Sequence, residues 1–260
     1  RWLFQHGVID GVSNQTTPVI VDGTMYVTDS RGSVYAVDAA NGHLLWLYDV
    51  TDLLGGARRE GYIFRHRGVT YADGVVYSAA GSFIFALDAE TGQVVWVNDS
   101  TSAQYIKQPH GAPAFAGVAP QGALAATEDV LLVPGGRSVP AAFERKTGKF
   151  LYFQFGGKGT GGSFVCADEK NAYVHTRVRG VRIFELQSGT VLDRQINEPV
   201  LTDGGTISVA DDVLHAATGT MEFKVDVDAS GDLIRAGSRI YAAGANVISV
   251  VNSAGKVVAS

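Results

Sequence analysis

The sequence predicts an all-β protein, a β-propeller made of four-stranded antiparallel blades. Short apolar runs rich in Val, Ile, Tyr, Phe and Trp recur along the chain. Glycine-containing turns separate them, which is the pattern of antiparallel strands joined by hairpins. The chain has 32 glycines in 260 residues and only 7 prolines, which suits many tight turns. The pattern itself repeats, and four strands with a period of about 40 residues indicate a propeller.

The clearest repeat runs from Val69 to Asn98, with the sequence VTYADGVVYSAAGSFIFALDAETGQVVWVN. Asp73-Gly74 precedes its first apolar run, and the turns Gly81-Ser82 and Glu90-Thr91-Gly92 separate the next ones. In the preceding copy the predicted strands are PVIVD, TMYVTD, SVYAVD and HLLWLYD. A small sheet of this kind cannot bury both of its faces alone, so it requires neighbouring copies of itself.

Six copies are marked by the glycine of the hairpin turn before the last strand: Gly42, Gly92, Gly148, Gly189, Gly231 and Gly255. In the first four copies an acidic residue stands four positions earlier: Asp38, Asp88, Glu144 and Glu185. The pattern becomes less regular toward the C-terminus, and the last copy has room for about three strands. The whole chain, 1–260, is therefore predicted to form one propeller domain.

The two ends of the chain leave two arrangements open. Residues 1–5, RWLFQ, have the pattern of the outer strand of a blade that lacks its other strands. Either this strand completes the last blade and closes the ring, or the six copies are part of a seven- or eight-bladed ring. The chain begins with Arg1 rather than Met, which is compatible with a signal peptide that has been removed.

Composition excludes several classes of protein. Apolar residues make up 46% of the chain and charged residues 18%, as in a packed globular protein. The net charge of -5 gives no indication of a nucleic-acid partner. No apolar run approaches the roughly 20 residues of a membrane span. The single cysteine, Cys166, excludes an internal disulfide, and its apolar surroundings predict a small buried hydrophobe.

Two insertions, 51–67 and 101–121, and the glycine-rich loop 156–162 lengthen the connections between copies. Insertions in repeat folds form loops that often carry the binding function. The first insertion is locally basic in an acidic protein, which suits an acidic ligand or partner; the alternative is a solvated loop. The candidate binding residues in the two insertions are Arg58, Arg59, Tyr62, Phe64, Arg65, His66, Tyr105 and His110.

The segments DGTMYVTDSRGSVYAVDAANGHLLW and DGVVYSAAGSFIFALDAETGQVVW resemble the repeat of the pyrroloquinoline-quinone-type (PQQ-type) propellers. In that family an outer-strand tryptophan docks each blade onto its neighbour. The resemblance gives this role to Trp46 and Trp96, with Tyr152 in their place in the third copy. Later copies depart from the pattern at the matching positions: Asp193, Arg235 and Ala259. Weaker docking is therefore expected in the second half of the chain.

The resemblance leaves both an enzyme and a scaffold open. The family contains quinone-dependent alcohol and sugar dehydrogenases as well as non-catalytic propellers of the outer-membrane protein assembly machinery. The alcohol-oxidising enzymes stack PQQ against a disulfide of adjacent cysteines and hold Ca²⁺ with Glu, Asn and Asp. One cysteine cannot form that disulfide, so no bound PQQ and no catalytic residue are predicted.

A calcium loop is the one candidate metal site in the sequence. Its oxygen ligands would come from the segment DVDASGDL: Asp226, Asp228, Ser230 and Asp232. The twelfth position of such a loop is Gly237, where a bidentate Glu is expected. The alternative is an ordinary hairpin turn around Gly231, in which Asp, Ser and Gly serve the backbone geometry.

These observations predict a non-catalytic, extracytoplasmic scaffold of the periplasm or cell envelope, which binds protein partners through the loops of one face. The location follows from the family resemblance alone. The first alternative is a PQQ-dependent dehydrogenase, whole or as a fragment. The second is a carbohydrate-binding propeller, for which the sequence offers only aromatic residues in loops.

Overall fold

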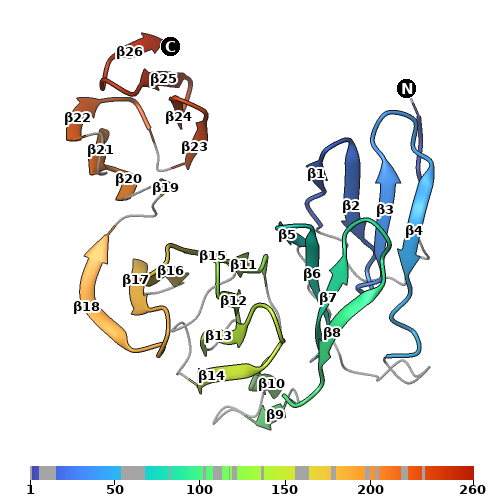
Figure 1. Cartoon of the computed structure of the whole chain (residues 1–260). Coiled ribbons are helices and arrows are strands. Elements are labelled where there is room, and N and C mark those ends of the chain that lie inside the picture. The colour runs from blue at the N-terminus through green and yellow to red at the C-terminus, as the bar shows by residue number, and fades with distance from the viewer. Residues whose placement is uncertain are drawn as a thin grey trace.

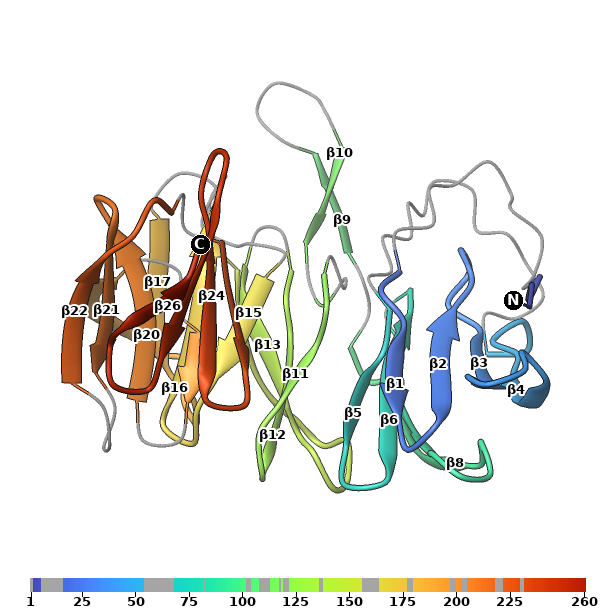
Figure 2. The same ribbon diagram turned by 90° about the horizontal axis from the view of Figure 1, so that it is seen from above.

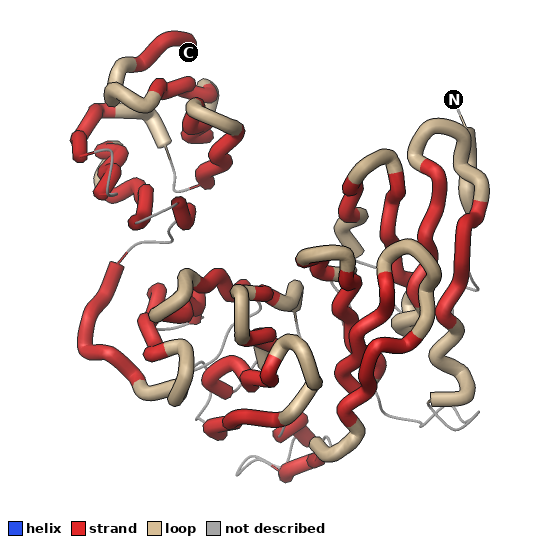
Figure 3. The backbone as a smooth tube through the Cα atoms, in the orientation of Figure 1, coloured by secondary structure: helices blue, strands red, loops and turns tan. Residues whose placement is uncertain are grey.

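The computed structural model describes residues 2–5, 16–53, 68–81, 83–101, 104–107, 113–116, 118, 122–135, 138–155, 164–176, 180–196, 200–202, 205–217, 222–229 and 232–260. All regular elements in these ranges are β-strands (Figure 3). No helix in this part of the chain is long and apolar enough to cross a membrane.

The strands form six four-stranded antiparallel sheets, numbered here in chain order (Figure 1). Sheet 1 contains β1 (Val19–Val21), β2 (Thr24–Thr28), β3 (Val34–Asp38) and β4 (Leu44–Tyr48). Sheet 2 contains β5 (Thr70–Ala72), β6 (Val75–Ala80), β7 (Phe83–Asp88) and β8 (Val94–Asn98). Sheet 3 contains β11 (Ala125–Ala126), β12 (Val130–Val133), β13 (Ser138–Glu144) and β14 (Phe150–Phe155).

The second half of the chain continues the same construction. Sheet 4 contains β15 (Phe164–Ala167), β16 (Asn171–Thr176), β17 (Gly180–Glu185) and β18 (Val191–Ile196). Sheet 5 contains β19 (Val200–Thr202), β20 (Gly205–Ala210), β21 (Val213–Ala217) and β22 (Glu222–Asp226). Sheet 6 contains β23 (Asp232–Ala236), β24 (Arg239–Ala243), β25 (Ile248–Asn252) and β26 (Val257–Ala259). A separate hairpin, β9 (Gln104–Lys107) with β10 (Pro113–Ala116), lies between sheets 2 and 3 in the chain.

Apolar side chains bury both faces of the inner sheets, as the repeat pattern predicts. One cluster joins sheets 1 and 2, a second joins sheets 2 and 3, a third joins sheets 3 and 4, and a fourth joins sheets 5 and 6. Phe85, Phe143 and Phe184 are among the largest fully buried side chains of these clusters. The all-β propeller class and the repeated four-stranded sheet are therefore confirmed.

The hairpin turns have the backbone geometry that their sequences predict. Asp22-Gly23 and Asp73-Gly74 connect the first two strands of sheets 1 and 2, with φ of 47° and 79° in one turn and 50° and 76° in the other. Two successive residues with positive φ are typical of the two-residue turn that matches the twist of a hairpin. Sheet 5 makes the same turn with Asp211-Asp212, at φ of 50° and 61°, without a glycine.

The predicted hairpin turn at Gly231 is wrong. Strands β22 and β23, on either side of it, belong to different sheets, and Gly231 itself lies outside the described residues. Strand β23 pairs instead with β24 across the short turn at Gly237, where φ is 58°. A two-residue turn holds its strands together more directly than a five-residue connection, so the shorter hairpin forms. Sheet 6 consequently has four strands rather than about three, and Arg235 lies on its first strand instead of an outer one.

Residues 2–5 lie against sheet 1. Trp2 contacts Gly42, and the Phe4 ring meets the Tyr35 ring edge to face at 5.7 Å. Sheet 6 takes all of its strands from residues 232–259, so residues 2–5 do not complete it. The two termini lie at opposite ends of the row of sheets (Figure 1).

Candidate functional site

A series of aromatic residues, each lying on a glycine of the next sheet, connects the sheets. We call this series the docking ladder. Its pairs are Trp2 with Gly42, Trp46 with Gly92, Trp96 with Gly148, Tyr152 with Gly189, and Phe223 with Gly255. A Cβ at Gly92 would lie only 2.6 Å from Cδ2 of Trp46, and Gly92 also has a φ of 71°. Glycine is therefore required there both for the turn and for the close approach of the ring.

A hydrogen bond accompanies four of the five pairs. The aromatic donor group bonds to the carbonyl oxygen of the residue that follows the acidic residue of the turn. The bonds run from Trp2 to Ala39 (3.1 Å), Trp46 to Ala89 (3.0 Å), Trp96 to Arg145 (3.0 Å) and Tyr152 to Leu186 (2.8 Å). Phe223 has no donor group. The turn presents this carbonyl because its glycine N–H bonds back to the acidic residue, as Gly92 does to Asp88 O at 2.9 Å.

The three residues predicted to dock the blades all belong to the ladder. The Trp96 side chain is buried, with 9% of its surface exposed, and Trp46 and Tyr152 are half-buried. Burial raises the pKa of Tyr152 to about 12, and the nearby carboxylate of Glu185 adds to the rise. Sequence reasoning missed Phe223, because the displaced turn at Gly231 put Arg235 in its place. The aromatic residue at position 223 and the turn at Gly255 were the signals that could have found it.

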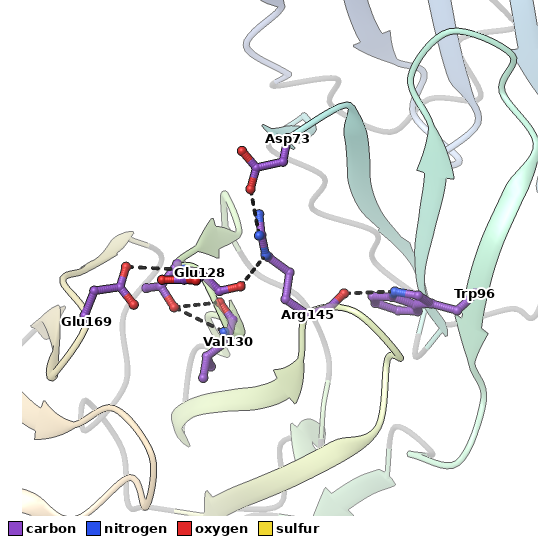
Figure 4. Close-up of polar contacts among 7 residues, drawn as sticks. Asp73, Trp96, Glu128, Val130, Arg145 and Glu169 are labelled. Atoms are coloured by element: carbon purple, nitrogen blue, oxygen red, sulfur yellow. Dashed lines mark hydrogen bonds and ion pairs between the residues drawn. The ribbon is translucent and has the colours of Figure 1, made fainter.

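Arg145 connects the turns of three sheets on the ladder side (Figure 4). Its guanidinium donates to Glu128 O at 2.9 Å and to a carboxylate oxygen of Asp73 at 2.7 Å, while its own carbonyl accepts the Trp96 indole N–H. The backbone N–H of Glu128 donates to the carboxylate of Glu169 in sheet 4 at 3.3 Å. Arg145 is buried, so its charge is neutralised in the structure largely by Asp73. Copies 1 and 2 have alanine at this position, and the charged residue was the signal in the sequence.

All three predicted insertions belong to connections between the last strand of one sheet and the first strand of the next. In an up-and-down sheet these connections lie at one end of the strands, and the ladder turns lie at the other. We call the first end the insertion face. Figure 2 shows the β9–β10 hairpin projecting at this end, whereas the β1–β2 and β5–β6 turns lie at the opposite end.

Most candidate binding residues lie outside the described part of the chain: Arg58, Arg59, Tyr62, Phe64, Arg65, His66 and His110. The backbone of Tyr105 lies on β9, opposite Phe115 of β10. The structure therefore places one member of the predicted binding set, and it does so on the hairpin of the insertion face.

The candidate calcium loop connects sheet 5 to sheet 6. Asp226 ends β22 and Asp228 follows it, and both side chains are exposed; Ser230 and the side chain of Asp232 lie outside the described residues. Within the described ranges no group of three His, Cys, Asp or Glu residues could hold a metal ion. The hairpin-turn alternative fails as well, because the flanking strands do not pair.

The described residues do not fit a quinone with its cation. Cys166 lies half-buried on β15, packed against the apolar cluster of Tyr173, Val181 and Ile183, and the chain has no second cysteine to pair with it. The donor set needed beside the quinone is also missing from the described ranges. No catalytic step can be derived from these residues.

Comparison with known proteins connects the chain to two groups. The family model described as outer membrane protein assembly factor BamB matches residues 2–155. The dehydrogenase subunit of a quinone alcohol dehydrogenase from Acetobacter aceti is 28% identical over 207 residues, which cover 72% of this chain and 26% of that protein. The corresponding subunit from Gluconacetobacter polyoxogenes is 43% identical over 84 residues, 31% of this chain and 11% of that protein. The chain thus spans a quarter or less of the length of these curated relatives.

Solved structures from both groups share the fold. The quinohemoprotein alcohol dehydrogenase ADHIIG from Pseudomonas putida HK5 matches with a TM-score of 0.57 and 17% identity, over 99% of this chain and 43% of that one. BamB from Moraxella catarrhalis matches with a TM-score of 0.53 and 14% identity, over 94% of this chain and 75% of that one. At these identities the likeness concerns the propeller fold alone.

Proposed function

The chain belongs to the family of the outer membrane protein assembly factor BamB, and we propose that it is a non-catalytic scaffold that binds protein partners through its insertion face. The membership agrees with the resemblance to PQQ-type repeat propellers seen in the sequence. We place the scaffold outside the cytoplasm, in the periplasm or at the outer membrane, in keeping with the family's description.

The observation that carries this proposal is the division of labour between the two ends of the sheets. The glycine turns and Arg145 occupy one end with contacts between sheets. The connections lengthened by insertion leave from the other end, where the β9–β10 hairpin projects (Figure 2). Loops on a rigid repeat scaffold are the usual place for a binding surface.

The test shortens one insertion at a time. Residues 104–116 are replaced by a short Gly-Ser linker in the full chain, and the variant and the wild type are used to capture proteins from a cell-envelope extract. The control exchanges Lys146, an exposed residue of the ladder side, for Ala. We expect a specific partner to bind the wild type and the control but not the shortened chain. Equal capture by all three would remove the binding surface from the insertion face.

A quinoprotein dehydrogenase is the second candidate, and one observation favours it: the curated relatives named above are quinone alcohol dehydrogenases, up to 43% identical in part of the chain. The purified protein is given PQQ, Ca²⁺ and an alcohol, with an artificial electron-accepting dye. We expect neither quinone binding nor dye reduction, because the described residues lack the cysteine pair and the cation ligands. Stoichiometric quinone binding with dye reduction would establish the enzyme instead.

A further inference from the structure

The face of sheet 1 that points away from sheet 2 is covered in an unusual way. Val27, Tyr35 and Val37 are buried there in a cluster that also includes Met25 and Phe4. The apolar clusters between other sheets have four strands on each side, whereas the cluster on this face is covered by residues 2–5. In the described part of the chain these four residues pair with no strand, so their side chains hold them in place.

The same face continues as exposed apolar surface on both sides of this segment. Ile20 lies directly opposite Met25, Leu44 opposite Val37 and Leu47 opposite Tyr35. Directly opposite residues of paired strands point to the same face of a sheet. Their exposed fractions are 62% for Ile20, 48% for Leu44 and 45% for Leu47. Contiguous exposed apolar surface of this kind marks interaction sites.

The seated segment shows which chemistry the face accepts. The Trp2 ring lies on Gly42, and its indole N–H donates to Ala39 O at 3.1 Å. The Phe4 ring meets the edge of Tyr35, while Leu3 between them is 92% exposed. This is the alternation of an extended chain, with the first and third side chains toward the sheet and the second toward solvent.

We propose that the outer face of sheet 1 is a docking site for an extended segment of a protein partner that presents Trp and Phe two residues apart, and that residues 2–5 occupy this site until the partner displaces them. The proposal rests on the function proposed above and adds a second binding surface to it. Because residues 2–5 are tethered to the site, their effective concentration is on the order of millimolar, and an incoming segment must compete with it.

The experiment uses the full chain with Trp2→Ala and Phe4→Ala, which vacates the site, and a labelled peptide with the sequence of residues 1–5, RWLFQ. Fluorescence anisotropy measures binding. We expect the vacated chain to bind the peptide at least tenfold more tightly than the wild type does. A peptide with Trp2→Ala should bind at least tenfold more weakly, and one with Leu3→Ala should bind as well as the original.

Two further measurements keep the result open to contradiction. Gly42→Ala in the vacated chain should abolish peptide binding, since its Cβ would occupy the place of the indole; circular dichroism checks that this variant folds. The second is light scattering of the wild type, which we expect to show a monomer with respect to this contact. Absence of peptide binding to the vacated chain would overturn the proposal, as would a dimer that dissociates on Trp2→Ala and Phe4→Ala. A partner lost with residues 104–116 while the peptide fails to bind would refute the docking site and leave the scaffold function standing.

Discussion

Between sheets 1 and 4 each junction combines an apolar cluster with an aromatic ring that lies on a glycine and donates a hydrogen bond across the junction. At the junction of sheets 5 and 6, Phe223 takes the aromatic place without a donor. Between sheets 4 and 5 the described residues contain neither an aromatic–glycine pair nor a shared apolar cluster. The decline follows the decline of the repeat pattern in the sequence.

The side chains of sheet 5 explain part of this difference. On the face toward sheet 6 it presents apolar residues such as Ile207 and Leu214. On its other face Ser208, His215 and Lys224 lie in a row across three neighbouring strands. Polar groups lose free energy when they are buried without partners, so this face gains little from stacking. The comparison teaches that the strength of a junction depends on both faces that meet there, and not on the strand count.

The sharpest test of the comparison is Trp96→Ala beside Phe223→Ala. Loss of the buried Trp96 should lower the free energy of unfolding by about 3–5 kcal/mol. Phe223→Ala should cost about 1 kcal/mol less, because no hydrogen bond is lost with it. Urea unfolding followed by circular dichroism measures both. Val95→Ala, at an exposed position on the same strand as Trp96, serves as the control and should change little. A larger cost for Phe223→Ala would break the comparison.

The glycine side of the ladder gives the next largest effect. Gly92→Ala places a Cβ against Trp46 and strains a backbone of positive φ, so we expect a loss of about 2–4 kcal/mol. Gly74→Ala is the matched control, since φ is 76° there and no atom lies within 4 Å of the new Cβ. It should cost roughly 1 kcal/mol, the backbone term alone. Equal losses in the two variants would mean that the ring contact contributes nothing.

Tyr152 makes one junction sensitive to alkaline pH. Its pKa in the folded state, about 12, lies above the ordinary value of 10.0. The folded protein therefore holds this proton more tightly, and the associated stability is complete below pH 10 and is lost as the pH rises toward 12. After allowance for the partial exposure of the ring, the loss should be about 1–2 kcal/mol. The stability difference between the wild type and Tyr152→Phe, measured from pH 8 to 12, should shrink over that window; a constant difference would contradict it.

The smallest expected effect is a gain. Asp212→Gly should stabilise the protein by about 0.5–1 kcal/mol, because Asp212 has a φ of 61° at a turn position where sheets 1 and 2 have glycine. Thermal unfolding measures the shift in Tm. The reverse exchange, Gly23→Asp, should lower the Tm by a similar amount. If Asp212→Gly is destabilising, the weakness of sheet 5 does not extend to its turns.

The sequence allowed the prediction of the fold and of the strands in sheets 1 and 2, because the local pattern of turns and apolar runs determines them. It failed at β23, which has two possible neighbours; the choice between β22 and β24 depends on the relative lengths of two turns. The contacts between sheets could be predicted only on one side. Trp46 and Trp96 carry a visible pattern, but their partners Gly92 and Gly148 follow only once the sheets are stacked.

Each contact of the docking ladder runs in one direction, from an aromatic residue to a glycine of the sheet that follows in the chain. A single repeat in the regular part of the ladder, such as sheet 2, therefore contains both halves of the interlock, a glycine that receives the ring before it and a ring that enters the glycine after it. Gene duplication within such an array yields a longer array in which every new junction is already matched. Deletion of a whole repeat likewise rejoins a ring with a glycine. Natural variation in blade number is the evolutionary consequence of this head-to-tail arrangement.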